Sequence, residues 1–241
     1  MLPRSAHSPA SSTAEAFARK VIASRTVWTM SGEDGLARVP STSRPGREVT
    51  LCWSSAEAAE RLGRGMARHA RVNPIVLGNF VGTVLPKLRA LNRLVAPDWS
   101  ADPYHPQLEA GQLEHLIKAE STQHVIAAVV ARGAVYTLEN DIGPAYAASQ
   151  QGGAKQALAV WTSEDDAASH IKGFWAEMTV AEIPLETFTG KTLPYVAGLG
   201  RGVSLDYGMG GVATELGALD LAARLLRGRS GGLVRRANVQ R

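Results

Sequence analysis

The chain repeats itself: residues 21–113 align with residues 129–221 at a constant offset of 108, without a gap. About one position in four is identical. The identical pairs include Val27 and Val135, Trp53 and Trp161, Phe80 and Phe188, Pro86 and Pro194, and Asp98 and Asp206. A solenoid unit typically has about 20–50 residues, so this period is too long for one. The repeated unit is therefore a whole domain.

The repeat predicts the domain organisation of the 241 residues. We expect a flexible N-terminus over residues 1–13, a first repeat over 14–118, a second repeat over 122–227 and a basic tail over 228–241. A repeat of roughly 100 residues can bury its own core. The sequence shows neither a signal peptide nor an apolar run near the roughly 18–20 residues that span a bilayer. These features predict a cytoplasmic protein that does not contact the membrane.

The net charge of +4 hides an uneven distribution. Residues 14–120 carry 14 basic and 11 acidic side chains, whereas residues 121–226 carry 6 basic and 11 acidic ones. The second repeat is therefore acidic, at −5, and the tail from Arg227 adds five arginines without an acid. The basic isoelectric point thus comes from the first repeat and the tail, and the whole-chain value does not argue for nucleic-acid binding.

Each repeat is predicted to have an α+β fold, with helices packed on a meandering antiparallel or mixed sheet. An opening helix (residues 14–24 and 123–132) precedes β-forming runs separated by turn residues. Further helices and short strands follow, and a closing helix (107–119 and 212–226) completes the unit. Pro86 and its repeat equivalent interrupt an apolar helical stripe, so we expect that helix to kink or break.

A helix is also predicted directly after the third strand of each repeat. Ser54 with Glu57, and Thr162 with Asp165, have the spacing of a capping box. In the second repeat, an apolar stripe at helical spacing extends this prediction. Its members are Ala167, Ile171, Phe174, Trp175 and Met178.

Short motifs shared by the two copies resemble the bacterial family called domain of unknown function 2750. In the first repeat they are Val27-Trp28-Thr29, Cys52-Trp53-Ser54, Leu85-Pro86 and Asp98-Trp99. The second repeat has Val135-Tyr136-Thr137, Val160-Trp161-Thr162, Leu193-Pro194 and Asp206-Tyr207. The resemblance covers nearly all of both repeats and implies a tandem duplication of that domain. It implies a fold but no activity, and therefore no catalytic residues.

The acidic second repeat suggests a binding function. Acidic surfaces complement the basic clefts of nucleases and nucleotide-using toxins. Our first hypothesis is therefore a non-catalytic immunity protein (antitoxin) that binds and neutralises a toxin or effector protein. The candidate partner-binding residues are Glu139, Asp141, Glu164, Asp165, Asp166, Asp98, Trp99, Asp206 and Tyr207.

An alternative hypothesis is a module that binds nucleic acid or phosphate. Arg61, Arg64, Arg68 and Arg71 recur at helical spacing and would form one basic stripe. The arginine-rich tail would add a salt-sensitive attraction to the same ligands.

An enzyme of unknown type is a second alternative. No histidine of one repeat matches a histidine of the other, and no Cys/His cluster has zinc spacing. Only Cys52, Asp98 and Asp206 remain as candidates for chemistry. We therefore expect no enzymatic activity, no metal and no cofactor.

The tail is predicted to lie outside the fold. Residues 228–232 read Gly-Arg-Ser-Gly-Gly and should end the closing helix. The remainder has no amphipathic period, so we expect a disordered, dispensable segment.

Overall fold

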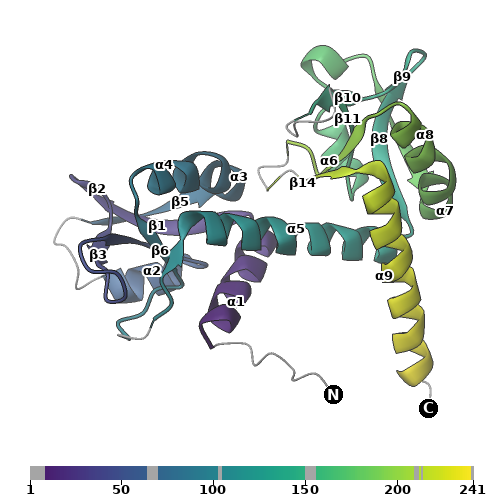
Figure 1. Ribbon diagram of the computed structural model, residues 1–241. Helices are drawn as coiled ribbons and strands as arrows, with labels where there is room; N and C mark the ends of the chain where they lie inside the picture. The colour runs from purple at the N-terminus through teal and green to yellow at the C-terminus, as the bar shows by residue number, and fades with distance from the viewer. Residues whose placement is uncertain are drawn as a thin grey trace. The chain divides into compact units, whose positions relative to one another are not determined.

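The computed structural model describes residues 9–63, 70–102, 105–149, 156–208, 212 and 214–239 (Figure 1). The chain divides into two compact units between Ser121 and Thr122, and Val212 belongs to the first unit. None of the helices in these ranges combines the length and hydropathy needed to cross a bilayer.

The first unit begins with a helix, continues through short strands and helices, and ends in a long helix. Its elements are α1 (Pro9–Ser24), β1 (Thr26–Gly32), β2 (Gly35–Leu36), β3 (Arg38–Pro40), β4 (Glu48–Trp53), α2 (Ala56–Gly63), β5 (Arg71–Val76), α3 (Leu77–Asn79), η1 (Phe80–Val84), α4 (Leu85–Ala90), β6 (Leu94–Pro97), β7 (Leu108–Glu109) and α5 (Ala110–Arg132).

The second unit repeats this order, and the last part of α5 serves as its opening helix. Its further elements are β8 (Ala134–Asn140), β9 (Gly143–Pro144), β10 (Tyr146–Ala148), β11 (Gln156–Val160), α6 (Glu164–Ala168), η2 (Gly173–Trp175), β12 (Thr179–Pro184), α7 (Leu185–Thr187), η3 (Phe188–Thr192), α8 (Leu193–Gly198), β13 (Gly202–Leu205), β14 (Thr214–Gly217) and α9 (Ala218–Val239).

The structure confirms the tandem α+β architecture. Strand β8 begins 108 residues after β1, β13 begins 108 after β6, and α9 begins 108 after α5. The sheets are mixed: β4 runs parallel to β6 and β11 parallel to β13, while their other neighbours are antiparallel. A parallel pair requires a crossover connection, and the helices between β4 and β6 supply it.

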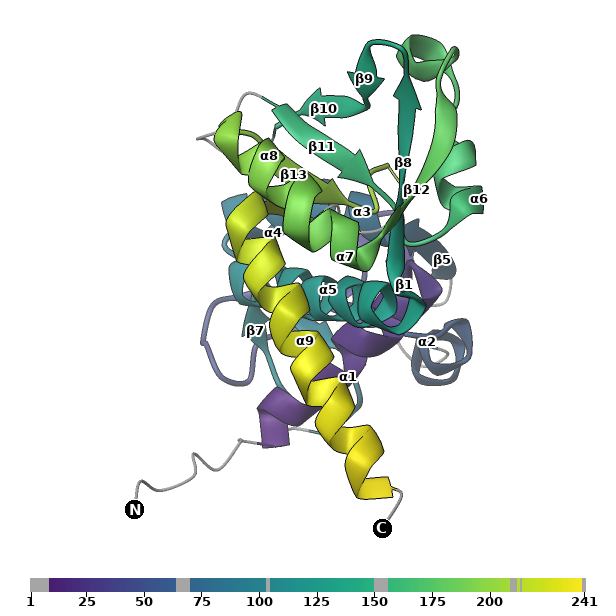
Figure 2. The same cartoon turned by 90° about the vertical axis from the view of Figure 1, so that its right-hand side faces the viewer.

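The central strands β4 and β11 are buried on both faces. In the second unit, Leu158, Val160 and Val203 pack against apolar residues of α5, α8 and α9, and Figure 2 shows α8 in front of β11 and β13. Trp161 packs on the opposite face with Leu138 and Trp175. The first unit buries Phe80 and Trp53 in the same two layers. The duplicated apolar positions are therefore core positions.

The helix that follows the third strand differs from its prediction. Its N-cap is Ser163 rather than Thr162, because the Ser163 hydroxyl accepts a hydrogen bond from the Asp166 N–H at 3.1 Å. Ser55 accepts the matching bond in the first unit. The predicted apolar stripe is also wrong: α6 ends at Ala168, and a short 3-10 turn follows, in which Gly173 has a φ of +57°.

The prolines change the helix type rather than ending the helix. A π-helical stretch precedes each proline, and the Leu85 N–H donates to the Phe80 carbonyl five residues earlier. The same geometry recurs at Leu193 and Phe188. A proline has no backbone N–H and cannot donate the hydrogen bond that a helix would need at its position. The π-helical shift just before it therefore costs the helix no additional backbone hydrogen bond.

The closing helices also differ from their predictions. They begin later than expected, because short strands β7 and β14 precede them. The predicted break after Arg227 is wrong, since α9 continues as helix to Val239 where we expected a disordered tail. A Cβ on Gly228 would lie 3.2 Å from a methyl group of Val130. Gly228 thus allows α9 to approach α5 closely, which offsets its low helix propensity.

Candidate protein-binding cleft in the second repeat

A cleft of about 590 Å³ lies in the second unit, between the β8–β9 hairpin and the loop that carries η2. Residues from β10, β11 and the start of β13 complete its wall. Its lining includes Asn140, Ile142, Tyr146, Phe174, Trp175 and Arg201. Four segments that are distant in the sequence therefore converge on one concave surface.

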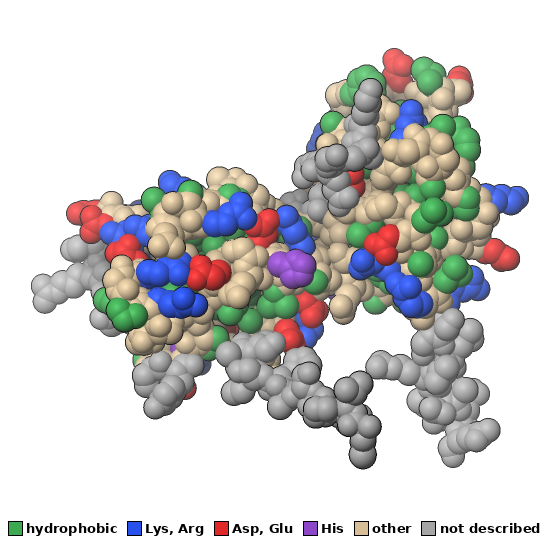
Figure 3. Space-filling view, viewed as in Figure 1, with side chains coloured by type: hydrophobic (Ala, Val, Ile, Leu, Met, Phe, Trp, Pro, Cys, Tyr) green, Lys and Arg blue, Asp and Glu red, His purple; other side chains and the backbone are tan. Residues whose placement is uncertain are grey.

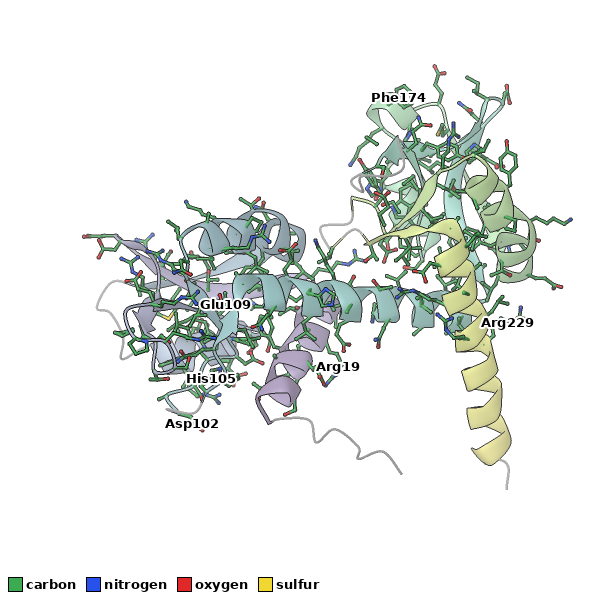
Figure 4. The ribbon with its side chains drawn as sticks, in the orientation of Figure 1. Arg19, Asp102, His105, Glu109, Phe174 and Arg229 are labelled. Atoms are coloured by element: carbon green, nitrogen blue, oxygen red, sulfur yellow. The ribbon has the colours of Figure 1, made fainter. Side chains whose placement is uncertain are left out.

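Two large apolar side chains stand at the rim of this cleft. Ile142 is 95% exposed at the tip of the hairpin, and Phe174 is 94% exposed in the η2 turn. Figure 4 shows Phe174 at one end of the second unit. Exposed apolar side chains beside a pocket are typical of protein-binding sites.

The floor of the cleft is aromatic and held by neighbouring core residues. The ring of Trp175 meets that of Trp161 edge-on at 6.0 Å between centroids. The guanidinium of Arg201 stacks over the ring of Tyr146, with 4.1 Å between Cζ and the centroid. The floor is therefore preformed, so binding would order few additional side chains.

The first repeat has charged residues at the same positions. There, Glu48 forms ion pairs with Arg38 and with Arg93, each at 2.9 Å. In the second repeat, Tyr146 and Gln156 replace Arg38 and Glu48. Of the three residues only Arg93 is kept, as Arg201. Loss of the carboxylate leaves Arg201 to stack on Tyr146 and exposes an apolar surface. The two copies therefore differ at these wall positions of the cleft.

The predicted acidic residues lie in two separate places. Glu139 and Asp141 are exposed at the hairpin end of β8. Glu177, which was not among the predicted residues, lines the cleft. Glu164 and Asp165 instead begin α6. This helix follows Trp161, which pairs with Tyr136 near the start of β8, at the other end of that strand. The charges of Glu164 and Asp165 are favourable at a helix N-terminus.

Acidic and exposed apolar side chains therefore adjoin at the hairpin. Figure 3 shows the two kinds side by side at the end of the unit that carries Phe174. We call Glu139, Asp141 and Glu177 the acidic rim of the cleft.

The other predicted binding residues form a duplicated structural motif. Asp206 accepts hydrogen bonds from the Thr162 N–H and hydroxyl, both at 3.1 Å. Asp98 accepts the same two bonds from Ser54, at 2.7 and 3.0 Å. We call these two pairs the aspartate clasps. The carbonyls of Trp99 and Tyr207 accept bonds from the indole N–H groups of Trp53 and Trp161, each at 2.9 Å.

The predicted arginine stripe is not carried by one helix. Arg61 is exposed on α2, which ends at Gly63, whereas Arg71 is the first residue of β5. Arg64 and Arg68 lie outside the described residues. The helical spacing therefore misplaced Arg71, because a strand begins before the stripe is complete.

A model for "Protein of unknown function (DUF2750)" matches the chain twice, over residues 14–117 and 122–225. The chain belongs to this family. None of the curated proteins matches its sequence. Among solved structures, it is similar to Anabaena Tic22 (protein transport), at 12% identity over 76% of this chain and 89% of that chain. The TM-score of 0.24 is too low to support a shared fold.

Two candidates for chemistry, Cys52 and His105, have pKa values that burial shifts in this DUF2750 protein. Burial raises the pKa of Cys52 well above its ordinary value, so the residue is a thiol at neutral pH and a poor nucleophile. Burial lowers the pKa of His105, whose Nε2–H donates to the Pro97 carbonyl at 2.9 Å. Its Nδ1 then accepts from the Ser100 hydroxyl at 3.1 Å.

Both ring nitrogens of His105 therefore bond to uncharged groups, the Pro97 carbonyl and the Ser100 hydroxyl. Within the described part of the chain, no group of three or more His, Cys, Asp or Glu side chains could hold a metal ion.

The residues that build the cleft were not among the predicted binding residues. A signal for them was present in the repeat itself, because an ion-pair set in one copy aligns with a tyrosine and a glutamine in the other. Only the structure shows, however, that these positions meet Phe174 and Ile142 in space.

Proposed function

We propose that this protein is a non-catalytic immunity protein, whose second repeat binds and neutralises a toxin or effector protein. The observation that carries the proposal is the pair of almost fully exposed apolar side chains, Ile142 and Phe174, beside a preformed aromatic cleft. A polar ligand would not require them, whereas a protein surface with an apolar projection would cover both.

The energetics favour a protein partner. Full burial of a Phe or Ile side chain contributes about 1.5–3 kcal/mol each. Interfaces draw most of their affinity from a few such residues, placed beside a pocket and surrounded by polar groups. The aromatic floor and the acidic rim supply that arrangement.

The charge of the second repeat supports a basic partner. Six basic and eleven acidic side chains give residues 121–226 a net charge of −5. A nuclease or nucleotide-using toxin carries a basic substrate site, so an acidic protein would be attracted to it and would block it. Neutralisation then requires binding alone, with no reaction.

Growth of cells that produce a toxin tests this proposal. The protein would be co-expressed with each candidate toxin that a neighbouring gene encodes, as wild type and as an Ile142→Asp/Phe174→Asp double variant. Tyr195→Asp is the matched control, because Tyr195 is an aromatic residue of the same unit that is 65% exposed on α8. We expect the wild type and the control to protect the cells and the double variant to fail.

Protection by the double variant would contradict a role for the cleft. Absence of protection by the wild type would contradict the immunity function itself. Binding of the purified protein to single-stranded or duplex DNA, lost at high salt, would favour the nucleic-acid alternative.

A further inference from the structure

Strand β12 forms one edge of its sheet, because the strand order is β12-β8-β9. Its six residues pair with β8 along their whole length. Within the described part of the chain, β12 pairs with no other strand. An unpaired edge presents a row of N–H and C=O groups that can accept another strand.

The hydrogen-bond pattern shows which residues of β12 face outward. Tyr136 directs both its N–H and its carbonyl to Trp161, at 2.9 and 2.8 Å, and therefore away from β12. Tyr136 is the partner of Glu182, so these two form a non-hydrogen-bonded pair. The backbone groups of Glu182, and of Val180 two residues earlier, consequently point away from β8.

The first repeat has this position blocked. Pro74 of β5 matches Glu182 of β12, and it pairs with Trp28 as Glu182 pairs with Tyr136. A proline removes the outward N–H, which is a common protection of edge strands. The second repeat has a donor at this place, and its own proline stands two residues later: Pro184 pairs with Ala134 and therefore also faces outward. The outward N–H groups of β12 are thus those of Val180 and Glu182.

We propose that the β12 edge is a second binding site, which an extended segment of a partner protein with basic side chains joins as an added strand. Glu182 is exposed, and its carboxylate accepts a bond from the Tyr136 hydroxyl at 3.2 Å. Exposed Glu186 follows four residues later, in α7. A lysine or arginine opposite Glu182 gives a favourable cross-strand pair.

A second copy of this chain is the poorer occupant. An antiparallel pair of two β12 edges would bring glutamates together, and like charges across strands are destabilising. The site is distinct from the cleft and does not depend on the immunity function, because the partner here need not be a toxin.

The experiment uses the full-length protein and a soluble synthetic peptide that alternates valine and lysine. Hydrogen exchange at single amides reports the binding. The peptide should slow exchange at the Val180 and Glu182 amides, while the Ala181 amide, which faces β8, should change little. A peptide that alternates valine and glutamate should bind about fivefold more weakly, because it places like charges opposite Glu182.

Two variants make the test specific. Glu182→Pro installs the residue of the first repeat and should abolish peptide binding with little loss of thermal stability. Glu182→Lys keeps the backbone donor and should reverse the preference between the two peptides. Phe174→Ala should leave peptide binding unchanged, which separates this site from the cleft.

Unchanged binding in Glu182→Pro, or no reversal in Glu182→Lys, would overturn the proposal. So would a dimer of the wild type that Glu182→Pro dissociates, since that result would assign the edge to a second copy. Failure of the cleft variants alone would leave the β12 site standing.

Discussion

Asp206 holds Thr162 through two hydrogen bonds to a single carboxylate oxygen, Oδ1, each 3.1 Å long. The backbone at Asp206 is left-handed, with a φ of +49°, and Asp98 in the first repeat has a φ of +50°. Aspartate and asparagine tolerate this conformation better than other residues with a side chain. The aspartate clasps therefore explain why these two acids are duplicated: they close the end of the sheet.

The clasp predicts a difference between two substitutions. Asp206→Asn keeps an oxygen that can accept both bonds and should cost little, whereas Asp206→Ala should lower the free energy of unfolding by about 2 kcal/mol. Chemical denaturation of the full chain measures both. Glu186→Ala is an exposed acidic control from the same unit. Equal losses in Asn and Ala would contradict the hydrogen-bond account.

Gly208 predicts a coupled pair of substitutions. A Cβ at Gly208 would lie 2.5 Å from Nε2 of His170, and the residue has a φ of +69°. His170 cannot move freely, because its ring lies 5.1 Å from that of Trp161 and its Nδ1 lies 2.9 Å from the Asp166 carbonyl. Gly208→Ala should therefore destabilise the second unit.

A double-mutant cycle separates the clash from the backbone strain. In a His170→Ala background, Gly208→Ala should cost only the left-handed strain, about 1 kcal/mol. The same cost with and without the histidine would show that no clash exists.

The pH dependence of stability should include a contribution from Glu109. Its side-chain hydrogen bonds with Arg47, at 2.6 and 2.9 Å, lower the pKa of Glu109 below its ordinary value of 4.5. A lowered pKa in the folded state contributes stability above pH 4.5, and this contribution is lost as the pH falls through the folded pKa. Glu109→Gln should remove that part of the acid sensitivity.

Acid titration of unfolding in three variants checks this assignment. Glu109→Gln, Arg47→Gln and the double variant should have similar acid profiles, because each removes the same pair. A further change in the double variant would show that the two residues act independently.

Alanine substitution of the two neighbouring aromatic residues in the η2 turn should change stability by very different amounts. Trp175 is 9% exposed and packs against Trp161, whereas Phe174 is 94% exposed. Trp175→Ala should lower the free energy of unfolding by about 3 kcal/mol or more. Phe174→Ala should leave stability unchanged within about 0.5 kcal/mol. A large loss in Phe174→Ala would mean that Phe174 belongs to the core and is not a binding residue.

The sequence predicted those features that the repeat or a local pattern determines. The constant offset identified the duplication, and the capping-box spacing correctly placed a helix directly after β4. Residue types at helix ends were less informative. Thr162 and Ser163 can both cap a helix, and only the distant Asp206 decides that Thr162 serves the clasp.

The candidate sites depend on contacts that no local pattern contains. Phe174 fits a helical stripe in the sequence, but Gly173 and the short α6 turn it outward. The direction of the Glu182 amide follows from the bridge between Tyr136 and Trp161. The continuation of α9 through Gly228 depends on packing in the same way. Val130 of α5 lies so close to Gly228 that a glycine fits best there.

The most direct test of the central claim is site-specific photo-cross-linking in cells, followed by titration of the purified partner. A photoreactive phenylalanine analogue would replace Phe174 in one protein and Tyr195 in another. We predict one discrete adduct at position 174 and none at 195. The captured protein should be basic, and Ile142→Asp/Phe174→Asp should weaken its binding by about a hundredfold or more. Equal cross-linking at both positions, or unchanged affinity of the double variant, would contradict the account.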